Sequence, residues 1–123
     1  MCAPPDLLCN SIINANKNIQ SVVIINKMGR PIEKVFKPKF ASQFADCMNE
    51  IFFMQCVLQI SIGRDFDEKY GPINYHISER ANHSILTFPA GEDVVLVITN
   101  KNVSPIALAR KIATLIGKDL AIT

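Results

Sequence analysis

The sequence lacks the segments that direct a protein to a membrane or to export. Its first ten residues, MCAPPDLLCN, contain no basic segment followed by an apolar one, so a secretory signal is not expected. The longest apolar-leaning run, residues 51–62, contains two glutamines and is shorter than the roughly 20 residues that a membrane-spanning helix needs. We therefore expect a cytoplasmic protein without a transmembrane segment.

An excess of charge is also missing. Charged residues make up 20% of the 123 residues and the formal net charge is +2, which is typical neither of a disordered chain nor of a nucleic-acid-binding domain. Hydrophobic residues make up 49%, enough for one core. The composition predicts a single domain over residues 1–123, with no nucleic acid as a partner.

Catalytic and metal-binding signatures are absent as well. The four cysteines, Cys2, Cys9, Cys47 and Cys56, form no CxxC pair, and we expect them to be reduced core residues. No serine or cysteine has a predicted histidine beside it, so we expect neither an enzyme nor a cofactor. His76 and His83 would face each other only across a two-residue turn, and two ligands make a poor metal site, so no metal is expected.

What the sequence does contain is a clear hairpin, SVVIINKMGRPIEKVF, at residues 21–36. Residues 22–25 are apolar and β-branched, the pattern of a strand buried on both faces. Residues 26–29 form the turn, and Gly29 suits the positive φ that such a turn requires. The return strand, residues 31–36, carries prolines and lysines at and around it, which suits an exposed sheet edge.

Three further strands and three helices complete the predicted order. The strands are expected at residues 73–78, 84–88 and 93–99, and the helices at residues 4–18, about 39–62 and 105–116. The strands that begin near Val22 and Val94 are apolar on both faces and should lie in the middle of the sheet. The sequence predicts an α+β fold, a three-layer α/β/α sandwich around a five-stranded antiparallel sheet, with residues 73–78 at an open edge.

The middle helix has apolar residues all round its distal half. One face, formed by Phe40, Phe44, Cys47, Met48, Ile51, Met54, Leu58 and Ile62, is expected to pack on the sheet. The opposite face then carries Phe52, Phe53, Cys56, Val57 and Ile60. A helix that is apolar all round needs a second packing surface, so we expect these residues to contact another polypeptide.

A basic stripe runs along the first hairpin and beyond it. It consists of Lys27, Arg30, Lys34, Lys37 and Lys39, with only Glu33 of opposite charge. The stripe is typical of a solvated sheet edge, and docking of an acidic protein or an anionic surface, or of nucleic acid, remains an alternative.

The order of elements resembles the roadblock family of dynein light-chain-like domains. The segment VVIINKMGRPI is similar to the first hairpin of that family, and AGEDVVLVITNKNVSPIALARKIATLI to its last strand and helix. The block from Gly71 to Thr99 is also similar to a group of small archaeal domains that share this fold.

The resemblance implies a non-enzymatic homodimer in which the third strands pair edge to edge and the second helices pack across the dimer axis. It also implies a platform for a small Ras-like GTPase or for another roadblock-like protein. The dimer or partner interface would then consist of Phe52, Phe53, Cys56, Val57, Ile60, Asn74, Tyr75, His76, Ile77 and Ser78, and charges at Phe53 and Ile60 would split the dimer.

A second hypothesis is a small-molecule sensor. Related sandwich folds hold a ligand between the sheet and a helix, and Met54, Cys56, Tyr75 and His76 would line such a pocket here.

Overall fold

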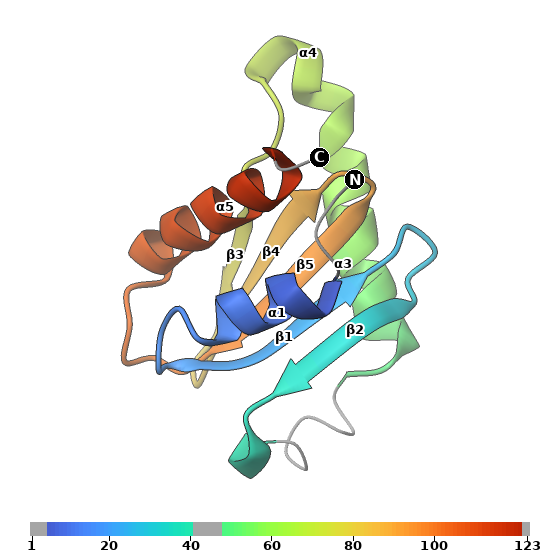
Figure 1. Cartoon of the computed structure of the whole chain (residues 1–123). Helices are drawn as coiled ribbons and strands as arrows, with labels where there is room; N and C mark the ends of the chain where they lie inside the picture. The colour runs from blue at the N-terminus through green and yellow to red at the C-terminus, as the bar shows by residue number, and fades with distance from the viewer. Residues whose placement is uncertain (1–4, 41–47, 122–123) are drawn as a thin grey trace.

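The computed structural model describes residues 5–40 and 48–121. Within these residues, five strands form one antiparallel sheet in the order β2-β1-β5-β4-β3 (Figure 1). The strands are β1 (Ile19–Ile25), β2 (Pro31–Phe36), β3 (His76–Glu79), β4 (Ser84–Ala90) and β5 (Asp93–Thr99). The predicted strand order is confirmed, with the two doubly apolar strands in the centre and β2 and β3 at the edges.

Helices cover both faces of the sheet. Helices α1 (Pro5–Ile13) and α5 (Pro105–Ala121) lie on one face, and α3 (Glu50–Gly63) lies on the other (Figure 1). Between α3 and β3 come a short 3-10 helix, η2 (Arg64–Phe66), and one helical turn, α4 (Asp67–Tyr70). The predicted three-layer α/β/α sandwich is therefore confirmed.

The core consists of two layers separated by the sheet. In β1 every residue is buried, and its side chains alternate between the two layers. Val22 and Ile24 pack with α1 and α5, whereas Val23 and Ile25 pack with α3. Because β1 and β5 contribute to both layers, only apolar residues fit along most of their length.

The first hairpin has the predicted geometry. Gly29 adopts a φ of +80°, and its N–H donates to the carbonyl oxygen of Asn26 at 2.9 Å. The side-chain oxygen of Asn26 accepts from the N–H groups of Met28 and Arg30 at 2.9 and 3.1 Å. The asparagine thus organises the turn from within, as is common where a short polar side chain can bond the following backbone.

Several predicted boundaries are wrong. Helix α1 ends at Ile13 rather than near residue 18, because Asn16 turns the chain by accepting a hydrogen bond from the N–H of Asn18 at 2.8 Å. Strand β3 begins at His76 rather than residue 73, since Ile73 packs against the α3 layer instead of pairing with β4. Helix α5 continues past Gly117 to Ala121.

The middle helix also starts later than predicted. Residues Pro38–Phe40 form a 3-10 helix, η1, and α3 begins only at Glu50. Phe44 and Cys47, which were assigned to the core face of a continuous helix, lie outside the described residues. In the part of the chain that the structure describes, no helix has the length and apolar character needed to cross a membrane.

Candidate functional site

The two faces of α3 are the reverse of those predicted. Its buried residues are Phe53, Cys56, Val57 and Ile60, which pack on β1 and β5, so they are not available to a partner. Charges at Phe53 and Ile60 would therefore lie in the core of their own subunit, so they would test its folding rather than a contact with a second subunit. Apolar side chains are spread almost evenly around this helix, so its sequence alone does not fix which face turns inward.

The outward face of α3 carries exposed apolar residues. Ile51, Leu58 and Ile62 are 72%, 48% and 63% exposed, although a sheet-facing role was predicted for them. Their spacing, with Gln55 and Gln59 beside them, places them along one side of the helix. We call Ile51, Leu58 and Ile62 the α3 stripe. These three side chains form a line of exposed apolar groups along the outer face of the helix.

Strand β3 is an open sheet edge. It pairs with β4, His76 opposite Thr87 and Glu79 opposite Ser84, and no other described strand pairs with its outer side. Its side chains alternate, with His76 and Ser78 on the α3 side and Ile77 packed toward α1 and α5. The predicted open edge is present, and its backbone groups are free to pair with another strand.

The remaining predicted contact residues lie elsewhere. Asn74 is exposed and precedes β3, and Phe52 is half-buried beside the stripe. The ring of Tyr75 lies 6.2 Å from that of Phe88, on the side of the sheet that faces α1 and α5. Tyr75 therefore belongs to the core rather than to a ligand pocket.

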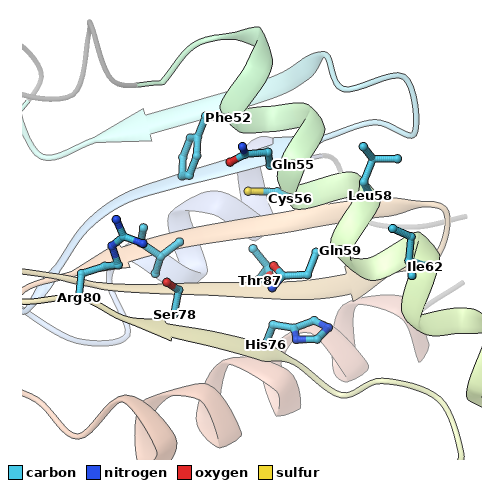
Figure 2. A pocket seen from close by; sticks show the side chains of 11 residues that line it. Phe52, Gln55, Cys56, Leu58, Gln59, Ile62, His76, Ser78, Arg80 and Thr87 are labelled. Carbon is cyan, nitrogen blue, oxygen red and sulfur yellow. The ribbon is translucent and has the colours of Figure 1, made fainter.

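A groove of about 540 Å³ separates α3 from the outer strands of the sheet (Figure 2). We call it the α3–β3 groove. Its helix wall includes Phe52, Gln55, Cys56, Leu58, Gln59 and Ile62, and its sheet wall consists of His76, Ser78, Arg80, Ile85 and Thr87. The groove exists because α3 packs mainly on the central strands and reaches only partly over β4 and β3. Of the four residues predicted to line a pocket, Cys56 and His76 do so.

A second groove, of about 470 Å³, lies on the other side of the α3 stripe. It runs between α3 and the β1–β2 turn and is lined by Met28, Gly29, Arg30, Glu50, Ile51, Met54, Gln55 and Leu58. Met54, also predicted to line the ligand pocket, faces this second groove instead. The α3 stripe is therefore a ridge with a hollow on each side.

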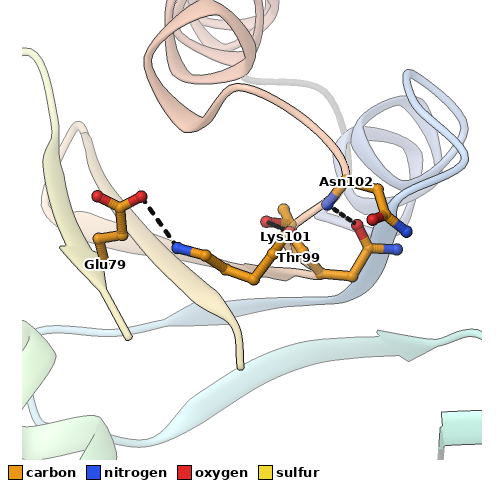
Figure 3. A network of polar contacts seen from close by, with 5 residues as sticks. Glu79, Thr99, Lys101 and Asn102 are labelled. Carbon is orange, nitrogen blue, oxygen red and sulfur yellow. Dashed lines mark hydrogen bonds and ion pairs between the residues drawn. The ribbon is translucent and has the colours of Figure 1, made fainter. Parts of the chain in front are cut away.

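Polar contacts fix the far end of β3. Lys101 Nζ lies 2.9 Å from Glu79 Oε1, joining the end of β3 to the segment that follows β5 (Figure 3). In that segment the N–H of Asn102 donates to Oδ1 of Asn100 at 2.8 Å. The Lys101–Glu79 ion pair is partly exposed and contributes little stability. It does engage the carboxylate of Glu79, the residue next to Arg80 in sequence.

The buried thiols of Cys9 and Cys56 are protonated and unreactive. Burial raises the pKa of Cys56 to about 11, and burial with the nearby charges of Glu33 and Asp6 raises the pKa of Cys9 to about 12. Both cysteines are buried and free, as predicted, while Cys2 and Cys47 lie outside the described residues. A protonated, buried thiol is a poor nucleophile, so neither suits catalysis.

The two histidines do not face each other. Pairing of Glu79 with Ser84 leaves four residues in the turn, and the N–H of Arg80 donates to the carbonyl oxygen of His83 at 2.8 Å. His83 therefore lies in the turn while His76 lies opposite Thr87. Across residues 5–40 and 48–121, the structure brings together no group of three metal-ligating side chains.

Contacts within the chain occupy part of the basic stripe. Lys37 Nζ donates to the carbonyl oxygen of Lys17 at 2.6 Å, and burial together with the charge of Lys39 lowers the pKa of Lys37. Lys27 Nζ lies 3.8 Å from Glu92 Oε2, and Lys39 Nζ lies 4.9 Å from the centre of the Phe40 ring. These contacts fit a solvated sheet edge.

No protein-family model and no curated protein matches the sequence. Solved structures do match the fold. The Roadblock/LC7 domain from Streptomyces avermitilis aligns with a TM-score of 0.68 at 15% identity, over 94% of each chain. MglB from Myxococcus xanthus aligns with a TM-score of 0.72 at 15% identity, over 94% of this chain and 91% of MglB. The chain has the roadblock fold.

The roadblock fold by itself does not select a function. Profilin II from Acanthamoeba castellanii aligns with a TM-score of 0.66 at 9% identity, over 93% of this chain and 94% of profilin. One architecture thus serves unrelated proteins, and function depends on the surface that each displays. In this roadblock fold the distinctive surface is the open β3 edge with the α3 stripe beside it.

Proposed function

We propose that this protein is a non-enzymatic, dimeric interaction module. Two copies would join through their β3 edges, which extends the sheet from one subunit into the next, and through their α3 stripes. The observation that carries this proposal is that the outer edge of β3 pairs with no other described strand, while α3 displays an exposed apolar ridge. The two contacts would stabilise the dimer in different ways. Pairing of the β3 edges gives backbone hydrogen bonds, and contact between the α3 stripes buries apolar surface.

The partner that the roadblock resemblance implies is a small Ras-like GTPase or another roadblock-like protein. The similarity to the roadblock domain and to MglB supports a protein-interaction role of this class. The second groove, with exposed Met28 and Ile51 at its rim, leaves an apolar surface next to the proposed dimer contact. A dimer would display two such surfaces.

Light scattering coupled to size exclusion tests the dimer. We expect the wild-type protein to have the mass of two chains at micromolar concentration, and Leu58→Asp combined with Ile62→Asp to have the mass of one. The matched control is Ile106→Asp, which places a charge on an exposed apolar residue of α5, on the opposite side of the sheet. A wild-type monomer, or a dimer that survives the double substitution, would overturn the proposal.

Affinity capture with the nucleotide state controlled tests the GTPase. Purified protein is incubated with host lysate containing GDP or a non-hydrolysable GTP analogue, and the bound proteins are identified by mass spectrometry. We expect a Ras-like GTPase to be retained in one nucleotide state and not in the other. Equal retention in both states, or no GTPase at all, would count against a regulatory role.

A further inference from the structure

The α3–β3 groove contains buried polar groups that lack partners. Thr87 is only 3% exposed and lines the groove, yet its Oγ1 has no hydrogen-bond partner among the described residues. The Nε2 atom of His76, which lies opposite Thr87 on the neighbouring strand, is buried and unpartnered as well. Most buried polar side chains in folded proteins have a partner, because leaving one unpaired is costly. Thr87 and His76 both line this one hollow, which is where a bound molecule would supply the missing partner.

The groove also carries a cation without a counter-ion. Arg80 lies at the end of its sheet wall and forms no ion pair in the part of the chain that the structure describes. None of the lining residues is acidic, and the neighbouring carboxylate of Glu79 is paired with Lys101. A guanidinium group binds carboxylate and phosphate oxygens through two parallel hydrogen bonds. The charge of the groove therefore selects an anion.

The shape of the groove adds a constraint on length. His76, Ser78 and Arg80 alternate along one strand and its extension, so the first and last are separated by roughly 13 Å. Figure 2 shows Arg80 at one end of this row and His76 at the other, with Gln55 and Gln59 above them on α3. The volume of about 540 Å³ falls within the range of small-molecule sites, roughly 300–1,000 Å³.

The geometry points to a binding site for an elongated small organic anion. Arg80 holds its carboxylate or phosphate, and Ser78, Thr87 and His76 bond polar atoms along its length. The apolar side chains of Cys56 and Ile85 pack against its carbon skeleton. The glutamines of α3 close over it as neutral hydrogen-bond donors and acceptors. The site is formed by one subunit, and Leu58 and Ile62 of its helix wall also belong to the α3 stripe, so the second copy of the proposed dimer would border the groove.

Calorimetric titration with two probes tests the site and distinguishes the sources of the anion. Adenosine monophosphate presents a phosphate at one end, and suberate presents carboxylates on a linear chain; adenosine and suberamide are their neutral counterparts. At constant ionic strength we expect one anion to bind at low millimolar concentration or better, and its neutral counterpart not to bind. Binding of the nucleotide identifies a phosphate ligand and binding of suberate a carboxylate ligand. Absence of binding by both anions would overturn the proposal.

Three variants place the binding in the groove. Arg80→Gln should raise the dissociation constant of the anion by about tenfold or more, since it removes the charged contact. Thr87→Val should weaken anion binding several-fold. It should also raise the thermal midpoint of the free protein, because it removes an unpaired buried hydroxyl. Arg110→Gln, on the exposed surface of α5, is the control and should change neither quantity. Equal loss in the Arg110 variant would mean non-specific attraction to basic protein.

Light scattering on the same variants separates this proposal from the proposed dimer. If Arg80→Gln and Thr87→Val change the mass of the protein and leave anion binding intact, the groove belongs to the subunit contact and the ligand site is overturned. If they abolish anion binding and leave the mass unchanged, the site stands whether or not the wild-type protein is a dimer.

Discussion

Gly29, at the tip of the β1–β2 turn, faces the side chain of Met54 on α3 so closely that a methyl group on Gly29 would lie 2.8 Å from Met54 Cε. Gly29 also has a φ of +80°, a conformation that costs other residues energy. The glycine therefore serves two purposes, one in the backbone of the turn and one in the approach of the hairpin to the helix.

This relationship predicts that two glycine substitutions differ. Gly29→Ala should lower the free energy of unfolding by about 1 kcal/mol through backbone strain, and by less than about 1 kcal/mol more because the flexible end of Met54 must shift. Gly91→Ala is the control, because Gly91 has a φ of +63° and nothing within 4 Å of the added methyl group. Urea unfolding of the two variants measures the difference. Equal losses would mean that Met54 moves aside freely.

The reversed faces of α3 predict losses of different size for two isoleucines of this helix. Ile60→Ala should lower the free energy of unfolding by about 3 kcal/mol, because Ile60 is 2% exposed and its truncation leaves a cavity against the sheet. Ile51→Ala should change it by less than about 1 kcal/mol, since Ile51 is 72% exposed. Urea unfolding at low protein concentration, where association contributes least, checks both values. A larger loss at Ile51 than at Ile60 would mean that Ile51 packs on the sheet, as the sequence pattern predicts.

The first turn of α3 depends on one asparagine. The side-chain oxygen of Asn49 accepts from the N–H of Phe52 at 3.0 Å and caps the helix. Asn49→Ala should therefore lower the free energy of unfolding by about 1 kcal/mol. Asn49→Asp should keep most of the stability of the wild type, because aspartate also caps a helix. Asn82→Ala, in the exposed β3–β4 turn, is the control and should be close to neutral. A neutral Asn49→Ala would show that packing alone fixes the start of the helix.

The buried thiols predict slow chemical labelling. With a pKa of about 11, only about one molecule in a thousand has a Cys56 thiolate at pH 8, and burial blocks access as well. Iodoacetamide in the native state should leave Cys9 and Cys56 unmodified, and both should react after unfolding in urea. Peptide mapping by mass spectrometry identifies the modified positions. Rapid native labelling of Cys56 would mean that α3 lifts from the sheet.

The same raised pKa values affect stability at alkaline pH. The ordinary thiol pKa is 9.0, so the unfolded chain loses its thiol protons before the folded chain does. The contribution of Cys56 to stability is complete below pH 9 and should be lost as the pH rises toward about 11. Cys56→Ala should reduce the slope of unfolding free energy against pH in that window. An unchanged slope would mean that other groups account for it.

Most of the architecture follows from strand patterns in the sequence. The runs at Val22 and Val94 are apolar at every position, which only a central strand covered on both faces accommodates, and this fixed the order of the sheet. The turn at Asn26–Gly29 was predictable because it uses residues with specific backbone geometry.

The orientation of α3 was not predictable in the same way. Helix α3 spans only Glu50–Gly63, and within these residues both faces are apolar. Only Cys56 and His76 of the four residues predicted to line a pocket lie in the α3–β3 groove, because its lining depends on how far the helix reaches across the sheet. Thr87 and Arg80 are ordinary strand and turn residues in sequence, and only the fold brings them beside α3.

The pairing of β1 with β5 joins segments from near the two ends of the chain. Such distant partners meet only after much of the intervening chain has been ordered, so the entropy lost in closing that loop should slow folding. During synthesis, β1 leaves the ribosome long before β5 exists, with one side of a highly apolar strand unpaired. Only α1 and the hairpin with β2 can protect it early, and chaperone binding to the nascent chain should be strongest in that interval.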